Sequence, residues 1–137
     1  MIVVDANVVI AASAPTHPHH AAAQRIVAEH GGDGMVLHPL TMAEVLVGPA
    51  RAGVEVRARR LLEEAGFSVA AGGGPEPEVL ARVRAAASLK MPDACVLATA
   101  EQLAAPLATF DQRLAREARV RQVAVLGLAT PSASEGS

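Results

Sequence analysis

Apolar and polar residues follow one another along the chain in short blocks, and these blocks predict helices and strands in alternation. Five apolar runs, several of them rich in β-branched residues, predict buried strands at Ile2–Val4, Met35–Leu37, Phe67–Ala70, Pro106–Thr109 and Gln122–Leu126. Between them, Val54–Ala65 and Pro75–Ala87 have the pattern of amphipathic helices, and the other segments are bounded by helix-starting or helix-ending residues. We therefore expect helices over Asn7–Ala14, His19–Glu29, Thr41–Val47, Val54–Ala65, Pro75–Ala87 and Pro92–Leu103, and from Asp111 to about Arg119.

Proline and glycine set most of the predicted helix ends. Pro15 ends the first helix and the glycines of segment 31–34 end the second, while Gly48 and Pro49 should stop the helix that starts at Thr41. Pro92 stands at a first-turn position, which proline tolerates well because its missing N–H has no helical partner there. The three glycines Gly72–Gly74 predict a flexible loop. It is not a phosphate-binding loop, because the Lys-Ser/Thr ending of such loops is missing.

This alternation predicts an α/β fold with a short central parallel sheet flanked by helices on both sides. The chain has 137 residues, which is enough for one core. We see no internal repeat or linker, so we expect a single domain over residues 1–129 and a disordered polar tail over 130–137.

Composition narrows the range of functions. The only aromatic residues are Phe67 and Phe110, so a nucleic acid would be held mainly by charge, metal and shape. The net charge of −2 lacks the basic excess of a simple DNA-coating protein. Arginine clusters at Arg51–Arg60 and Arg113–Arg121, and solvated helix faces explain most of these residues.

Cysteine usage and hydropathy indicate the compartment. A single cysteine, Cys95, excludes an internal disulfide and fits a reducing cytoplasm, where we expect the protein to be located. We find no signal peptide and no apolar run of membrane-spanning length.

Four acidic residues each have an ordinary structural explanation. Asp5 and Asp111 fit helix N-terminal positions, and Asp93 follows Pro92 in a first turn. Glu44 lies three residues after Thr41, which is the spacing of a capping box. Taken singly, none of the four predicts a function.

Their positions relative to the predicted strands change that interpretation. Asp5 and Asp111 follow strands Ile2–Val4 and Pro106–Thr109, so parallel strands would bring both to one edge of the sheet. Asp93 begins the helix before the second of these strands, and Glu44 lies on the helix after Met35–Leu37. Lys90 is the only lysine, so few ammonium groups could neutralise these acids, whereas a divalent cation could. Oxygen ligands without cysteine favour Mg²⁺ or Mn²⁺ over Zn²⁺.

Four segments carry these acids: Met1-Ile2-Val3-Val4-Asp5-Ala6-Asn7-Val8, Thr41-Met42-Ala43-Glu44-Val45-Leu46, Met91-Pro92-Asp93-Ala94-Cys95-Val96-Leu97-Ala98-Thr99-Ala100 and Thr109-Phe110-Asp111. In this order and spacing they resemble the signature segments of PIN-domain ribonucleases. The short chain is similar in particular to VapC-type toxins of bacterial toxin–antitoxin pairs, over residues 1–126.

The resemblance implies a three-layer PIN-like fold and a Mg²⁺-dependent endoribonuclease toxin. It makes Asp5, Glu44, Asp93 and Asp111 the metal-binding acids, with Asn7 and Thr109 as supporting residues. It also implies an RNA substrate, a cognate antitoxin partner and a homodimer, with no membrane association. Some PIN nucleases have a further acid where this chain has Leu97, so we expect a four-acid site. Lys90, Arg113 and Arg116 are candidates for phosphate contacts.

Two alternatives remain open at this stage. Asp5 could be the nucleophile of a phosphatase or phosphotransferase, although Asp5-Ala6-Asn7 lacks the second acid of haloacid-dehalogenase-like enzymes and of receiver domains. A non-catalytic PIN-like module that binds RNA or protein is the other.

We interpret the cluster of His17, His19 and His20 as a polar loop, because zinc-like spacing is missing. Cys95 should be a small buried side chain rather than a nucleophile.

Overall fold

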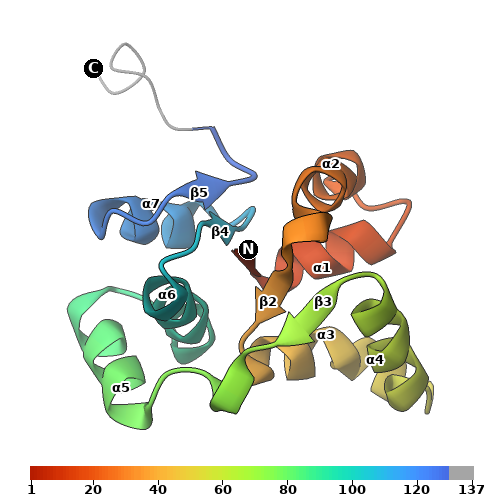
Figure 1. Ribbon diagram of the computed structural model, residues 1–137, viewed down its shortest axis with the longest axis horizontal. Coiled ribbons are helices and arrows are strands. Elements are labelled where there is room, and N and C mark those ends of the chain that lie inside the picture. Colours follow the sequence, from red (N-terminus) through yellow and green to blue (C-terminus); the bar gives the residue numbers. More distant parts are fainter. Residues whose placement is uncertain (130–137) are drawn as a thin grey trace.

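The computed structural model describes residues 1–129 and contains one five-stranded sheet, shown in Figure 1. The predicted tail, 130–137, lies outside the described residues. All neighbouring strands are parallel, in the order β3-β2-β1-β4-β5. The strands are short: β1 (Ile2–Val4), β2 (Met35–Leu37), β3 (Phe67–Val69), β4 (Leu107–Ala108) and β5 (Val125–Leu126).

Seven α-helices cover the two faces of the sheet in the described chain, as Figure 1 shows. They are α1 (Ala6–Ser13), α2 (His20–His30), α3 (Pro39–Arg51), α4 (Glu55–Glu64), α5 (Pro77–Ala86), α6 (Met91–Leu103) and α7 (Gln112–Val120). In β1, Ile2 and Val4 join the core under α1, α2 and α3, whereas Val3 joins the core under α5, α6 and α7. This alternation places β1 at the centre of a three-layer α/β sandwich, which confirms the predicted fold class.

The helix that carries Glu44 is longer than predicted. Helix α3 continues through Gly48 and Pro49 to Arg51, so the predicted stop was wrong. Pro49 lies in the last turn, where its missing N–H costs only one helical hydrogen bond. Its carbonyl oxygen still accepts from the N–H of Ala52 at 3.1 Å and from that of Val54 at 3.0 Å.

The predicted capping box of Thr41 and Glu44 is also wrong. Helix α3 begins at Pro39, and His38 is its N-cap, with Nδ1 accepting from the N–H of Leu40 at 3.0 Å. Burial lowers the pKa of His38, so the neutral ring keeps an acceptor nitrogen. Thr41 is fully buried within the helix, and its Oγ1 has no hydrogen-bond partner.

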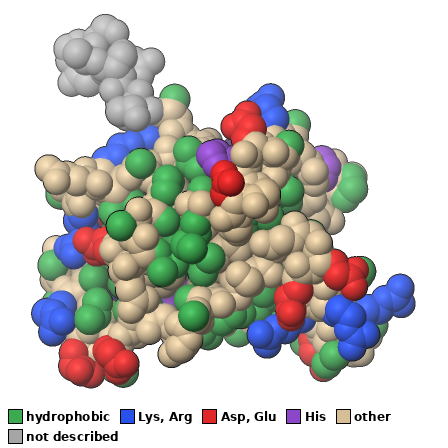
Figure 2. Space-filling model, viewed as in Figure 1, with side chains coloured by type: hydrophobic (Ala, Val, Ile, Leu, Met, Phe, Trp, Pro, Cys, Tyr) green, Lys and Arg blue, Asp and Glu red, His purple; other side chains and the backbone are tan. Residues whose placement is uncertain are grey.

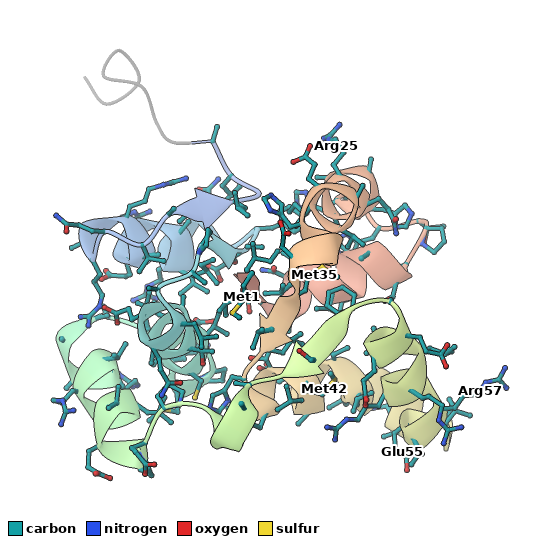
Figure 3. All side chains as sticks on the ribbon, viewed as in Figure 1. Met1, Arg25, Met35, Met42, Glu55 and Arg57 are labelled. Carbon is teal, nitrogen blue, oxygen red and sulfur yellow. The ribbon has the colours of Figure 1, made fainter. Side chains whose placement is uncertain are left out.

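Charged residues of α4 lie at the periphery. The side chains of Glu55 and Arg57 point outward from α4 to the outside of the molecule, whereas Met35 and Met42 lie inside it (Figure 3). On the face of the molecule that Figure 2 shows, charged side chains lie mostly towards the rim and hydrophobic side chains across the middle. Helix α4 therefore has a solvated face, as expected for part of the Arg51–Arg60 cluster. No helix within residues 1–129 is long and apolar enough to cross a membrane.

Candidate metal centre

Asp5 lies at the carboxyl end of the central strand, as predicted, and it is the N-cap of α1. Its Oδ1 accepts from the N–H of Ala6 at 2.8 Å, and its Oδ2 accepts from Oγ1 of Thr109 at 2.8 Å. The residue is only 8% exposed. Burial raises the pKa of Asp5 from 3.8 to about 6, although the two hydrogen bonds oppose the rise and Asp93 and Asp111 add to it.

Strand register brings Thr109 to Asp5. Val4 of β1 pairs with Ala108 of β4, and the Asp5 N–H donates to the Ala108 carbonyl at 2.9 Å. The next residue of each strand is therefore at the same edge, and Thr109 is fully buried there. The sequence motif alone could not supply this contact, because it depends on which strands are neighbours.

Thr109 and Asn7 form a small polar network around the carboxylate. Thr109 Oγ1 accepts from the N–H of Asp111 at 3.0 Å and from Asn7 Nδ2 at 3.5 Å. Asn7 Oδ1 in turn accepts from the N–H of Phe110 at 3.3 Å. Because two donors occupy the Thr109 oxygen, its own hydrogen is directed to Asp5 Oδ2, which is the arrangement that an ionised Asp5 requires.

The other three acids lie on separate helices, and two of them, Asp93 and Asp111, are near enough to act on the charge of Asp5. Asp111 is the N-cap of α7, with Oδ1 accepting from the N–H of Leu114 at 3.0 Å. Asp93 occupies the first turn of α6 and is half-buried. Glu44 projects from α3 and is exposed, and it contributes to the lining of an apolar groove described below.

The acids influence one another electrostatically. Burial raises the pKa of Asp93, and Asp111 raises it further, whereas Lys90 and Arg113 lower it. Although Glu44 is exposed as a residue, partial burial of its carboxyl group and then the charge of Asp93 raise its pKa. The three aspartates thus form one group of interacting negative charges, and Glu44 joins it through Asp93.

The donor chemistry fits a hard divalent cation, although the acids do not form a complete cage. Among residues 1–129, no three His, Cys, Asp or Glu side chains are close enough to be a preformed metal site. Mg²⁺ needs no such cage, because it usually keeps several waters and binds through one or two carboxylates. A buried carboxylate with a raised pKa, surrounded by further acids, is a group whose ionisation a cation would favour.

The predicted phosphate-contact residues divide into two sets. Lys90 and Arg113 are exposed and influence Asp93 electrostatically, so they flank the acids. Arg113 also donates to Ser88 Oγ at 3.0 Å. Arg116 instead lines a separate hollow of about 520 Å³ together with Gln112 and Arg119.

Two residues outside the predicted site form a stacked pair, and one of them, Phe110, separates Thr109 from Asp111 in the sequence. The ring of His19 stacks on that of Phe110, with centroids 4.5 Å apart and an angle of 17° between the planes. Neither local spacing nor composition predicts this pair, because the residues come from distant segments. Cys95, in contrast, is buried in α6 as predicted, and burial raises the pKa of its thiol.

Comparison with known proteins gives one family and several similar structures. The model of the PIN domain family matches residues 2–120. No match is found among curated proteins. The chain is 24% identical to PAE2754 from Pyrobaculum aerophilum (TM-score 0.58), covering 85% of this chain and 84% of that one.

Two further structures match more of their own length. A toxin–antitoxin complex from Klebsiella pneumoniae is 23% identical with a TM-score of 0.63, covering 84% of this chain and 90% of that one. FitAcB from Neisseria gonorrhoeae is 23% identical with a TM-score of 0.62, covering 92% and 96%. At these identities the structures show the shared fold.

Proposed function

The chain belongs to the PIN domain family, whose members are typically nucleases, and on this premise we propose that it is a metal-dependent endoribonuclease acting as the toxin of a toxin–antitoxin pair. The observation that carries the proposal is the buried Asp5 carboxylate at the carboxyl edge of the sheet, linked electrostatically to Asp93 and Asp111. Ligand sites of open α/β sheets lie at this edge.

Asp5, Asp93 and Asp111, with Glu44 at the rim, are the residues that would hold Mg²⁺ or Mn²⁺. The ion would supply charge stabilisation on the scissile phosphate and lower the pKa of a bound water. Thr109 fixes the orientation of Asp5 through its hydroxyl, and Asn7 holds Thr109 and the backbone of Phe110 in turn. Both are positioning residues in this proposal.

A carboxylate that is not fully engaged with metal would take the proton of the attacking water. Glu44 and Asp93 are the candidates, because burial and neighbouring charge raise the pKa of each. The water oxygen would form the new bond to phosphorus as the bond to the 3′ oxygen breaks, and the leaving 3′ oxygen would take up a proton from solvent. The family resemblance implies 5′-phosphate and 3′-hydroxyl products. Lys90 and Arg113, which act electrostatically on Asp93, would contact the flanking phosphates.

The antitoxin partner is a further part of the proposal, and an apolar groove supports it. The groove has a volume of about 650 Å³ and lies between α1, α2, α3 and α4. Its lining includes Ile10 and Leu61, which are 43% and 55% exposed. Glu44 also lines it, so a peptide bound there would reach the rim of the acidic site. The similarity to a Klebsiella pneumoniae toxin–antitoxin complex agrees with such a partner.

Cleavage of a panel of RNAs with Mg²⁺, Mn²⁺ or EDTA tests the enzyme activity. Wild type should cut with either metal and not with EDTA, and Asp5→Ala and Asp93→Ala should lose activity. Asp33→Ala, which changes an acid in an exposed turn, is the matched control and should cut normally. Turnover that ignores EDTA would contradict the proposal. Retained RNA binding by an inactive Asp5→Asn variant would exclude the binding-only alternative, whereas a phospho-aspartate trapped on Asp5 would favour a phosphotransferase.

Oligomeric state and antitoxin binding need separate measurements. We propose a homodimer, as the resemblance implies, and light scattering coupled to gel filtration would measure its mass. Leu61→Glu, a charge placed on the groove wall, should weaken binding of the antitoxin encoded beside the toxin gene without reducing RNA cleavage. Val56→Glu is the control on the same helix, because Val56 is 69% exposed and does not line the groove.

A further inference from the structure

An aromatic pair includes a residue of the segment that carries two of the site residues. Phe110 stands between Thr109 and Asp111 in the sequence, and its half-buried ring carries the exposed imidazole of His19. The ring of His17 follows at 5.8 Å from His19, tilted by 39°. The segment before α2 therefore places the imidazole of His19 on the ring of Phe110 and that of His17 next to His19.

The stacked pair is held from several sides. The Phe110 N–H donates to Asn7 Oδ1 at 3.3 Å, and its ring packs against the core formed by β1, β2 and the neighbouring helices. Gly127 backs the ring so closely that a Cβ there would lie 3.2 Å from Cε1. The His19 N–H donates to His17 Nδ1 at 3.0 Å. Phe110 is thus fixed in place, whereas the His19 ring stays open to solvent.

We propose that His19 and Phe110 form a stacking platform for one unpaired nucleobase of the substrate strand, next to the scissile phosphate. The proposal rests on the proposed nuclease function and names how that site holds its substrate. Single-stranded nucleic acids bind by stacking their bases on flat π-systems, and both histidine and phenylalanine are among the side chains that provide them. The chain offers little else for this role, since Phe67 is 3% exposed and Trp and Tyr are absent.

Substitution of the exposed ring gives the first test. His19→Ala should lower kcat/KM for RNA by roughly 5- to 150-fold, the range that stacking of one base is worth, mainly through KM. His19→Phe keeps a flat ring and should restore most of the loss. His30→Ala, at the other end of α2, is the matched control and should cut like wild type. Equal activity of His19→Ala and wild type would overturn the proposal.

RNA with a single abasic nucleotide, moved step by step around the cleavage site, separates stacking from a structural role. One position should lower kcat/KM in wild type to the level of His19→Ala. The same abasic RNA should cause little further loss in His19→Ala, because the two changes remove one interaction. Full additivity of the two losses would contradict the platform.

A binding measurement keeps the inference testable if no cleavage is found. His19→Trp introduces the only tryptophan of the chain, so its fluorescence reports on the platform. In an Asp93→Asn background, single-stranded RNA should quench this signal, and the abasic RNA should not; a DNA strand of the same sequence shows whether the 2′-hydroxyl matters. Base-dependent quenching in this background, together with no RNA cleavage by the wild type, would support the platform and refute the nuclease. RNA cleavage by the wild type without base-dependent quenching in this background would do the reverse.

Discussion

Replacing Asp5 with asparagine should make the metal-free protein more stable at neutral pH and abolish its response to metal. A pKa of about 6 in the folded chain against 3.8 for an exposed aspartate corresponds to about 3 kcal/mol. Because the pKa of Asp5 is raised on folding, the contribution of this residue to the free energy of unfolding is fully present below pH 3.8. It is lost as the pH rises through 6. Above that pH, the wild type carries the whole cost of ionising a buried carboxylate.

The asparagine variant escapes this cost but loses part of the hydrogen bonding. Its Oδ1 can still accept from the Ala6 N–H, whereas its amide group faces a Thr109 oxygen that already accepts from two donors. One imperfect hydrogen bond costs about 1 kcal/mol. We therefore expect a net gain of about 2 kcal/mol at pH 8 and no gain near pH 4.

Urea unfolding followed by far-UV circular dichroism measures this difference, since the chain has no Trp or Tyr for fluorescence. The free energies of unfolding of wild type and Asp5→Asn should diverge by about 2 to 3 kcal/mol between pH 4 and pH 8. Asp33→Asn, in an exposed turn, should run parallel to wild type. At 100 times its dissociation constant, Mg²⁺ should add about 2.7 kcal/mol to wild type and nothing to Asp5→Asn. Parallel curves for wild type and Asp5→Asn across this pH range would refute the reasoning.

Three further changes test the structure around the site. Gly127→Ala should cost at least about 2 kcal/mol, because φ is +103° and the new Cβ would lie 2.6 Å from the Thr109 carbonyl oxygen; Gly32→Ala, with open space around it, should change stability by under about 1 kcal/mol. Thr109→Val should lower stability by about 1 to 3 kcal/mol and raise the pKa of Asp5 further, since it removes a donor to the carboxylate; Thr109→Ser should restore both in a pH titration. Leu97→Ala should cost about 2 to 5 kcal/mol by thermal unfolding, because Leu97 is fully buried; a smaller loss would mean that the core collapses around it.

The local pattern of the sequence determined which segments are helices and which are strands. It also predicted that several acidic residues lie at the carboxyl edge of the sheet. The β-branched run Ile2–Val4 and the apolar run Met35–Leu37 form strands at the predicted residues, because their burial on both faces leaves no polar period. Asp5 and Asp111 follow parallel strands as expected, and Asp93 lies in a first turn beside them. Proline did not end helix α3 as predicted. Pro49 lies in the last turn, where its missing N–H removes only one helical hydrogen bond, so the helix continues past it.

Only the tertiary structure decided which groups meet. The neighbour relation of β1 and β4 sets the Thr109–Asp5 hydrogen bond, and hence part of the balance that fixes the Asp5 pKa. The stacking of His19 on Phe110 depends on where the segment before α2 packs, which no local spacing encodes. Hydrophobic periodicity acts over a few residues, whereas burial, hydrogen bonding and charge interactions depend on distances between segments that are far apart in the chain.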